Sequence, residues 1–514
     1  MLFGKQALNK RAMKLALLFL LAPVILFAQR EDTWCFGESA QIKFIGGTVQ
    51  PNGSSSLFSA EECASISDQT GNLLFYAGPN YFHSNGWSPH DLTIWDRNNQ
   101  VMQNGDSLFG NISATNGTMI LPMVNDTSSY YVLSVNPYLF FQGLYCSLVD
   151  MTQNSGLGAV VLRDSLLING RLAEKLIAVK HSNGKDWWIL VHQIVLNDSS
   201  NVFYKLLVDS SGINYPDSQS IGTYYGNPAN YYRGIAGEMV FSEDGSKLVS
   251  TGYGLIDLFD FNRCTGELSN WQSLAPPNPS YPSDNFYGAS FSPNGSRLYI
   301  SSIANSLSLT SQYLYQFDLT AANIIGSRTL IHQLNIDLLN LGQHQIGPNG
   351  KIYIATSYDA FPLQHDTICN LNLSVINSPD SLGVGCDFQL FCIPIGNGRS
   401  YVGLPNMPNY NLGPLEVNCD SINRVGDLKN IFETFAIIPN PNRGEFKVKY
   451  SSAISGPTQI YINDFTGKQL ISFEFISKAG PNEKSIDAST FDKGFYFISI
   501  CTSSSTIVSK IIIE

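Results

Sequence analysis

One short pattern recurs six times in this chain: a tight turn, an apolar strand, and a second strand that ends in an acidic or amide residue. Residues 242–245 (SEDG) precede the strand LVSTG, and residues 292–295 (SPNG) precede the strand LYISS. The second strands end at Asp96, Asp150, Asp209, Asp260, Asp318 and Asn377. Repeats of roughly 40–55 residues built from β-hairpins are typical of propeller blades. The pattern therefore predicts an all-β chain whose larger part is a β-propeller.

The turns explain why each repeat forms a hairpin. Asp-Gly and Asn-Gly pairs between apolar runs favour hairpins, because glycine reaches positive φ at no steric cost. A single hairpin cannot bury its apolar face alone, whereas radial stacking of blades covers it. Asp244, Asn294 and Asn349 stand in these turns, where a ring of polar ligands is the alternative interpretation. We interpret them as turn residues with no further task.

The pattern divides the chain into four parts. Residues 34–407 are expected to form the propeller, with seven blades or, alternatively, six. In the seven-blade version, the first strands after Trp34 and the late segment 388–407 share a blade and close the ring. Residues 408–430 form a predicted linker, and alternating strands over 432–514 predict a small immunoglobulin-like β-sandwich.

The N-terminus predicts export. Residues 1–28 combine four basic residues with a short apolar core, which is typical of a signal peptide. No later stretch is long enough to cross a membrane, so no transmembrane segment is expected after signal removal. A net charge of −11 with no basic cluster argues against nucleic acid as a partner.

Nine cysteines follow the signal peptide, and cysteines of an exported protein can pair. Four of them cluster where the repeats end and could staple that region: Cys369, Cys386, Cys392 and Cys419. Zinc is the competing interpretation, but the chain has no CxxC pair with flanking histidines. We therefore predict no metal and no cofactor.

No established catalytic motif appears in the chain, so no catalytic residue is assigned. His181 and His192 flank an apolar strand and could face the central channel, although a structural role is the simpler interpretation. Trp87, His90 and Asp91 lie in a loop rich in Asn, Gly and Pro. That loop could bind a sugar through the indole ring and the carboxylate. The simpler alternative is a long loop capped by its own tryptophan.

The last part of the chain resembles the type A C-terminal sorting domain of the type IX secretion system of Bacteroidota. The matching runs are PNP at 439–441, GEFKV at 444–448, DFTGK at 464–468 and FDKGFYF at 491–497. The residues that carry the motif are Pro439, Asn440, Pro441, Gly444, Asp464, Gly467, Lys468, Gly494, Tyr496 and Lys510. The resemblance implies export by the type IX machinery, removal of this domain, and release or attachment at the outer surface.

The propeller region is similar to the N-terminal region of large Bacteroidota surface proteins linked to gliding and adhesion. The similarity rests on runs such as WCFG at 34–37, HSNGKDWW at 181–188, GKIYIA at 350–355 and GLPN at 403–406. It implies location and architecture rather than chemistry.

Together these features predict a secreted or surface-attached propeller of WD40-like repeats that binds a glycan or a protein at the cell surface without catalysis. The alternative is an extracellular hydrolase or lyase that acts at the central channel. Convergence of histidines and carboxylates at one channel mouth would favour the alternative.

Overall fold

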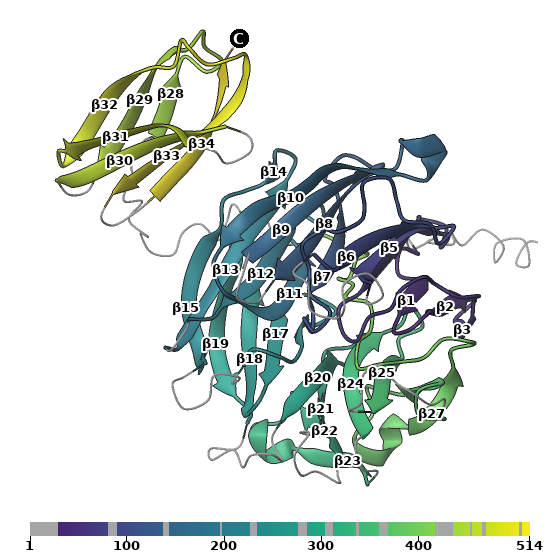
Figure 1. Ribbon diagram of the computed structural model, residues 1–514. Helices are drawn as coiled ribbons and strands as arrows, with labels where there is room; N and C mark the ends of the chain where they lie inside the picture. Colours follow the sequence, from purple (N-terminus) through teal and green to yellow (C-terminus); the bar gives the residue numbers. More distant parts are fainter. Residues whose placement is uncertain are drawn as a thin grey trace, which may run out of the picture. The chain divides into compact units, whose positions relative to one another are not determined.

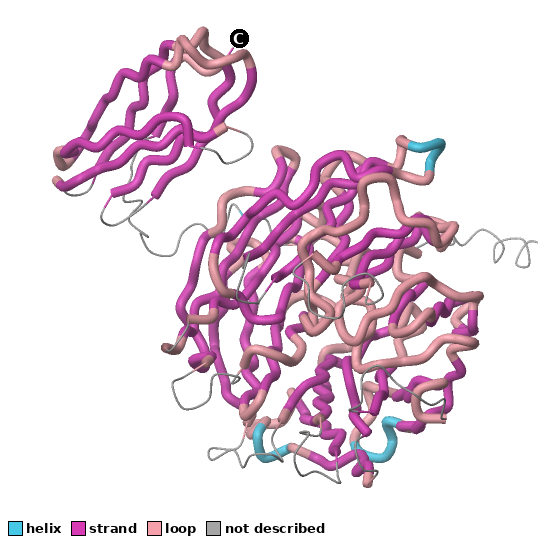
Figure 2. The backbone as a smooth tube through the Cα atoms, in the orientation of Figure 1, coloured by secondary structure: helices cyan, strands magenta, loops and turns pink. Residues whose placement is uncertain are grey.

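The computed structural model describes residues 29–80, 90–136, 143–195, 198–226, 234–275, 285–303, 312–335, 339–358, 368–416, 419, 435–452, 455–464, 469–502 and 506–513. The chain divides into two compact units, Met1–Leu415 and Glu416–Glu514. Strands dominate both units, and the described helical pieces are three short 3₁₀ turns at Asn154–Gly156, Ile325–Ser327 and Gly383–Cys386 (Figure 2). The prediction of an all-β protein is confirmed.

The first unit contains seven sheets among its described residues, and they follow one another around a common axis in chain order (Figure 1). We number these sheets as blades 1 to 7. Blade 1 contains β1 (Thr33–Phe36), β2 (Ala40–Ile45) and β3 (Thr48–Pro51). Blade 2 contains β4 (Ala64–Ser67), β5 (Leu73–Pro79) and β6 (Leu92–Asp96). Blade 3 contains β7 (Thr118–Pro122), β8 (Ser129–Asn136), β9 (Gly143–Asp150) and β10 (Ala159–Asn169).

The remaining blades have four or five strands each. Blade 4 contains β11 (Leu172–Lys180), β12 (Trp187–Gln193), β13 (Ser200–Asp209), β14 (Gly212–Ile213) and β15 (Asp217–Tyr225). Blade 5 contains β16 (Met239–Phe241), β17 (Lys247–Gly252), β18 (Leu255–Asn262) and β19 (Glu267–Ser273). Blade 6 contains β20 (Phe286–Phe291), β21 (Arg297–Ser302), β22 (Gln312–Asp318) and β23 (Thr329–Leu334). Blade 7 contains β24 (Leu339–Ile346), β25 (Ile352–Tyr358), β26 (Asn372–Ile376) and β27 (Phe388–Pro394). The predicted β-propeller is confirmed.

Blade 5 shows how the repeated turn builds each hairpin. Gly245 adopts φ +70° in the turn between β16 and β17, and its amide donates to the Ser242 carbonyl at 2.8 Å. The Asp244 carboxylate accepts the Ser246 amide at 3.0 Å. In the next turn of the repeat, Asn294 accepts the Ser296 amide at 2.9 Å. These side chains accept hydrogen bonds within their own turns, as turn residues do.

The acids that end the second strands are also turn residues. Asp150 accepts the backbone amide of Thr152 at 2.8 Å, and Asp209 accepts that of Ser211 at 2.7 Å. Asp318 repeats this pattern with Thr320 at 3.0 Å. Each carboxylate caps the chain reversal that follows its strand, which explains why an acid recurs in so many blades.

Blades 1 and 7 close the ring through two kinds of contact. Tyr353 packs edge to face against Trp34 and Phe44, whose own rings are tilted to each other, and the ring centroids are 5.0–5.5 Å apart. Glu38 and Arg399 exchange both backbone hydrogen bonds, at 2.9 and 2.8 Å, and their side chains form a 2.8 Å ion pair. Aromatic packing and a partly buried ion pair therefore join segments more than 300 residues apart in sequence.

The closing arrangement differs from the shared blade that the sequence suggested. β27 completes the sheet of β24–β26, and β1–β3 form a separate three-stranded sheet. Only the Glu38–Arg399 bridge joins these two parts as a backbone pair among the described residues. The first half of the segment 388–407 therefore belongs to blade 7, and its second half enters the centre of the ring.

The expected cysteine staple is wrong. Cys386 and Cys392 are free thiols, whereas Cys264 and Cys419 are disulfide-bonded. Cys264 lies in the turn after β18, beside Arg263, whose guanidinium donates to the Gly413 carbonyl at 2.7 Å. This hydrogen bond holds the end of the first unit against blade 5.

The second unit is a β-sandwich of the immunoglobulin-like class, as predicted. One sheet contains β28 (Phe435–Ile438), β29 (Glu445–Ser452) and β32 (Gly480–Asp487). The other contains β30 (Gly456–Asn463), β31 (Gln469–Ser477), β33 (Gly494–Thr502) and β34 (Thr506–Ile513). Alternating inward residues, among them Val448, Ile460 and Ile498, form the core between the sheets.

Gly444 and Gly480 give a matched test of packing in this sandwich. Both have φ +93°, but a Cβ on Gly444 would lie 2.5 Å from the Ser489 Cα, whereas a Cβ on Gly480 has nothing within 4 Å. We expect G444A to lower the unfolding free energy by about 1–3 kcal/mol more than G480A. Urea unfolding of the two variants measures this difference, and equal losses would contradict the close approach.

Candidate functional site

The inner ends of the blades bring charged side chains to the propeller axis. Glu61 and Glu62 precede β4, Glu174 and Lys175 lie on β11, and Glu238 precedes β16. All except the partly exposed Glu61 are at least nine-tenths buried. We call these five residues the axial cluster.

Two carboxylates of the axial cluster meet at one hydroxyl. The Thr115 hydroxyl lies 3.5 Å from Glu61 Oε2 and 3.3 Å from Glu174 Oε2. Burial raises the pKa of Glu174 to about 7. Burial also holds the pKa of Glu61 well above its usual range, and the Glu174 carboxylate raises it further. Since like charges this close resist joint ionisation, the pair retains a proton near neutral pH.

The other two acids of the cluster join neighbouring blades. Glu62 accepts the Asn111 amide at 2.8 Å and the Thr118 hydroxyl. Glu238 accepts the amides of Ala289, at 2.7 Å, and His344, at 3.0 Å. Burial raises the pKa of each acid to about 8. Both side chains satisfy backbone donors of other blades, so they serve as buried hydrogen-bond acceptors.

Lys175 is the basic member of the cluster. Its ammonium donates to the Ser250 hydroxyl at 3.2 Å and to the Thr251 carbonyl, and it lies 4.8 Å from the centre of the Tyr225 ring. Burial lowers the pKa of Lys175 to about 7. The His192 ring stacks on the same Tyr225 ring, at a centroid distance of 3.5 Å.

The chain's own segment 402–412, which we call the axial segment, lies between these side chains. The Gln343 amide donates to the Val402 carbonyl at 2.7 Å, and the Gln343 side chain accepts the Leu404 amide at 2.7 Å. The Asn406 side chain donates to the Leu176 carbonyl at 2.8 Å, and the Tyr410 hydroxyl donates to the Ile120 carbonyl at 2.7 Å. The axial segment thus bonds to blades 3, 4 and 7, and the predicted linker 408–430 begins inside the propeller.

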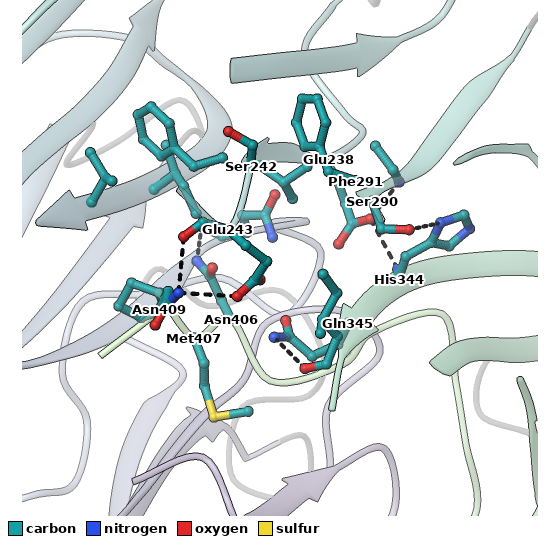
Figure 3. A pocket seen from close by; sticks show the side chains of 18 of the residues that line it. Glu238, Ser242, Glu243, Ser290, Phe291, His344, Gln345, Asn406, Met407 and Asn409 are labelled. Carbon is teal, nitrogen blue, oxygen red and sulfur yellow. Dashed lines mark hydrogen bonds between the residues drawn. The ribbon is translucent and has the colours of Figure 1, made fainter. Parts of the chain in front are cut away.

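A small cavity of about 70 Å³ remains beside the axial segment (Figure 3). Glu238, Ser290 and His344 line one side, and Asn406 and Asn409 line the other. The Ser290 hydroxyl lies 3.1 Å from His344 Nδ1, and burial lowers the pKa of His344 to about 3, which keeps the ring neutral. The cavity is too small for a sugar ring.

A larger cavity of about 540 Å³ lies at the face that carries the SEDG-type turns. Glu31, Asp32 and Glu243 line it together with Gln345 and Asn409. Glu31 accepts the Tyr410 amide at 3.0 Å, and Glu243 accepts the Asn409 side chain at 3.0 Å. Burial raises the pKa of Glu31 to about 8 and that of Asp32 to about 6. Its acids therefore hold the axial segment in place.

The histidines considered from sequence do not converge. His181 Nε2 lies 3.2 Å from the Cys264 carbonyl, His192 is buried against Tyr225, and His332 lies on β23 next to Phe388. The sequence singled out His181 and His192 for the channel, and of the four histidines His344 lines the 70 Å³ cavity. Among the described residues, no group of three or more His, Cys, Asp or Glu could hold a metal ion.

The candidate sugar-binding loop is only partly within the described residues. Trp87 lies outside them. His90 is exposed, with its ring 4.3 Å from the Phe109 ring. Asp91 is only 2% exposed, and its charge raises the pKa of Glu62, so it lies toward the axial cluster. A ligand at the surface could therefore reach His90 more readily than Asp91.

Several motif residues of the C-terminal sandwich have structural roles. Ile438–Pro439 and Asn440–Pro441 are cis peptide bonds, and Asn440 accepts the Ile512 amide at 2.8 Å. The Tyr496 hydroxyl donates to the Asp492 carbonyl at 2.7 Å. Asp464 and Gly494 flank strands β30 and β33, and Lys510 lies on β34 with its side chain undescribed. Gly467 and Lys468 are outside the described residues.

The axial cluster was not predicted from the sequence. Each member stands in or beside an apolar strand, as in ECASIS, LAEKLIAV and GEMVF. A charged residue at the start of the first strand in successive repeats was the available signal, because such a residue must find a partner when buried.

Glu238 provides a test of the buried acids. Its pKa rises on folding from an ordinary value of 4.5 to about 8, so the folded state binds the proton more tightly and Glu238 opposes folding progressively as pH rises between these values. We expect the stability of E238Q relative to the parent to increase from pH 5 to pH 8 by at most a few kcal/mol, at about 1.4 kcal/mol per pKa unit. Urea unfolding across this range measures the trend. A constant difference would show that Glu238 is ionised in the folded protein.

Comparison with solved structures gives distant similarities. A periplasmic gluconolactonase of Pseudomonas aeruginosa is 11% identical, with 80% of this chain and 99% of that chain covered and a TM-score of 0.34. A β-propeller domain from Myceliophteria thermophila is 13% identical, with coverages of 82% and 97% and a TM-score of 0.33. A quinoprotein alcohol dehydrogenase-like protein of Bacteroides thetaiotaomicron is 9% identical, with coverages of 73% and 77% and a TM-score of 0.37. No curated protein matches the chain.

The C-terminal unit matches a family directly. The model of the secretion system C-terminal sorting domain aligns with residues 436–514, which span all the strands of the sandwich from the second residue of β28 onward. In the part of the chain that the structure describes, no helix is long and apolar enough to cross a membrane. The PNP motif, the strand order and the family match agree, and residues 436–514 are a secretion system C-terminal sorting domain.

Proposed function

We propose that the propeller is a non-catalytic module that binds a glycan or a protein at the cell surface. The sorting domain implies export through the periplasm by the type IX machinery, to the surface or into the medium. Surface polysaccharides and proteins are the large molecules that an exported propeller meets there. Adhesion and gliding, which the sequence resemblance suggests, are settings in which such binding would act.

The axial segment is the observation that carries this proposal. A propeller hydrolase would need its axis open to substrate, whereas here the chain's own residues occupy the axis. Leu404, Asn406 and Tyr410 are nine-tenths or more buried, and their polar atoms pair with blade backbone and Gln343. A cavity of about 70 Å³ remains on one side of them, and the cavity of about 540 Å³ at the turn face is bordered by the axial segment and by the acids that bond to it. This arrangement favours binding through peripheral loops over chemistry at the axis.

One observation favours the second candidate, an extracellular hydrolase or lyase. Glu61 and Glu174 share the Thr115 hydroxyl, and at least one of the pair stays protonated near neutral pH. A protonated and an ionised carboxylate side by side can serve as general acid and base. Glu61 is partly exposed, so a substrate could make contact with this pair.

A binding assay and a turnover assay on the same protein separate the candidates. We expect the mature chain to bind a component of a glycan array or of intact cells, and E61Q and E174Q to bind it equally well. Binding without turnover in the parent supports the proposal. Cleavage of a bound glycan that falls at least about 100-fold in E61Q or E174Q would establish the enzyme instead. Absence of binding to both arrays and cells would reject the proposal.

Export gives a separate prediction. A chain that lacks residues 432–514 should accumulate in the periplasm, because the sorting domain is its address to the type IX machinery. Fractionation of cells and medium measures the distribution, and the G480A variant of the full chain is the control for a folded sorting domain. Unchanged surface or medium levels without the domain would contradict it.

A further inference from the structure

Cys35 and Cys63 lie in segments that face each other between blades 1 and 2. Cys35 belongs to β1, and Cys63 immediately precedes β4. Their side chains are 0% and 2% exposed, and both are thiols in this structure. Neither takes part in the axial cluster.

Hydrogen bonds on both sides of this pair fix how the segments align. The Ser67 amide donates to the Arg30 carbonyl at 2.9 Å, and the Ser59 amide donates to the Gly37 carbonyl at 3.0 Å. Between these bonds, the Ser65 hydroxyl donates to the Thr33 carbonyl at 2.8 Å. Residue numbers rise along one segment as they fall along the other, so the two run antiparallel.

This alignment places the two cysteines opposite each other. Ser65 faces Thr33, and two residues further along each segment Cys63 faces Cys35. β1 and β4 belong to different sheets, but the backbone hydrogen bonds on both sides of the pair hold the two segments in contact. A disulfide, which requires Cα atoms about 4.4–6.8 Å apart, would join the segments between these bonds.

We propose that Cys35 and Cys63 form a disulfide during export, which links blade 1 to blade 2. The signal peptide and the sorting domain take the chain through the periplasm, an oxidising compartment. Arg30 and Thr33, at the start of blade 1, already contact blade 2 beside this pair, so the bond would reinforce an existing contact.

The oxidation proceeds by thiol–disulfide exchange with a protein or small-molecule disulfide. The thiolate of one cysteine attacks that disulfide, forms a mixed disulfide and releases one thiolate. The thiolate of the other cysteine then attacks the first cysteine's sulfur in the mixed disulfide, forms the Cys35–Cys63 bond and releases the second thiolate of the oxidant. Two protons leave the cysteines, and their two electrons reduce the oxidant to a dithiol or two thiols. Burial raises the pKa of both cysteines, so the exchange must occur before the blades close over them.

Peptide mapping of the full-length exported chain tests the proposal. The chain is isolated from the periplasm or the medium, alkylated under denaturing conditions without reductant, and digested. We expect the peptides containing Cys35 and Cys63 to be linked, and Cys146, which is equally buried, to be alkylated. Cys264 and Cys419 serve as the internal control for retained disulfides. Alkylation of both Cys35 and Cys63 while the control stays linked would overturn the proposal.

A stability measurement on variants gives a second readout. Reductant should lower the Tm of the parent and of C146A by several degrees more than that of C35A/C63A, because only the first two would carry the Cys35–Cys63 bond. All three retain Cys264 and Cys419, so the loss of their disulfides affects the three proteins alike. Equal shifts in the parent and C35A/C63A would count against the bond. If C35A/C63A fails to fold, the mapping of the parent decides alone.

Discussion

Closure of the ring is the constraint on which the propeller depends. Each blade presents apolar residues on both faces, so no blade is covered until it has a neighbour on each side. Blades 2 to 6 gain neighbours from the chain order, but blades 1 and 7 must find each other across the whole unit. The Trp34, Phe44 and Tyr353 rings supply the apolar contact, and the Glu38–Arg399 bridge fixes its register.

Residues at the axis supply hydrogen bonds to backbone groups that the ring leaves without strand partners. The inner strands converge there, and their first residues leave backbone amides without strand partners. Glu62 and Glu238 accept hydrogen bonds from such amides. The Gln343 and Asn406 side chains form hydrogen bonds that link the axial segment to the blades. The buried acids keep raised pKa values because burial penalises their charged forms. The polar axis is therefore a scaffold of buried hydrogen bonds, in which Glu61 and Glu174 share the Thr115 hydroxyl.

Local patterns made much of this architecture predictable. The turns at Gly245 and Gly295, the acids at Asp150 and Asp209, and the alternating strands of the sandwich depend on residues close together in sequence. The PNP motif identified the sorting domain for the same reason. The candidate loop at Trp87, His90 and Asp91 was less informative, because the burial of Asp91 depends on contacts that its neighbours in sequence do not show.

The sequence by itself determined the hairpin repeat, the exported class of protein and the sorting domain, since turn chemistry and short motifs act over a few residues. Only the tertiary structure decided that Glu61 meets Glu174 at Thr115, that residues 402–412 fill the axis, and that the segments of Cys35 and Cys63 lie side by side. These groups come from blades or segments tens to hundreds of residues apart. Their proximity follows from how the ring closes, which no local pattern encodes.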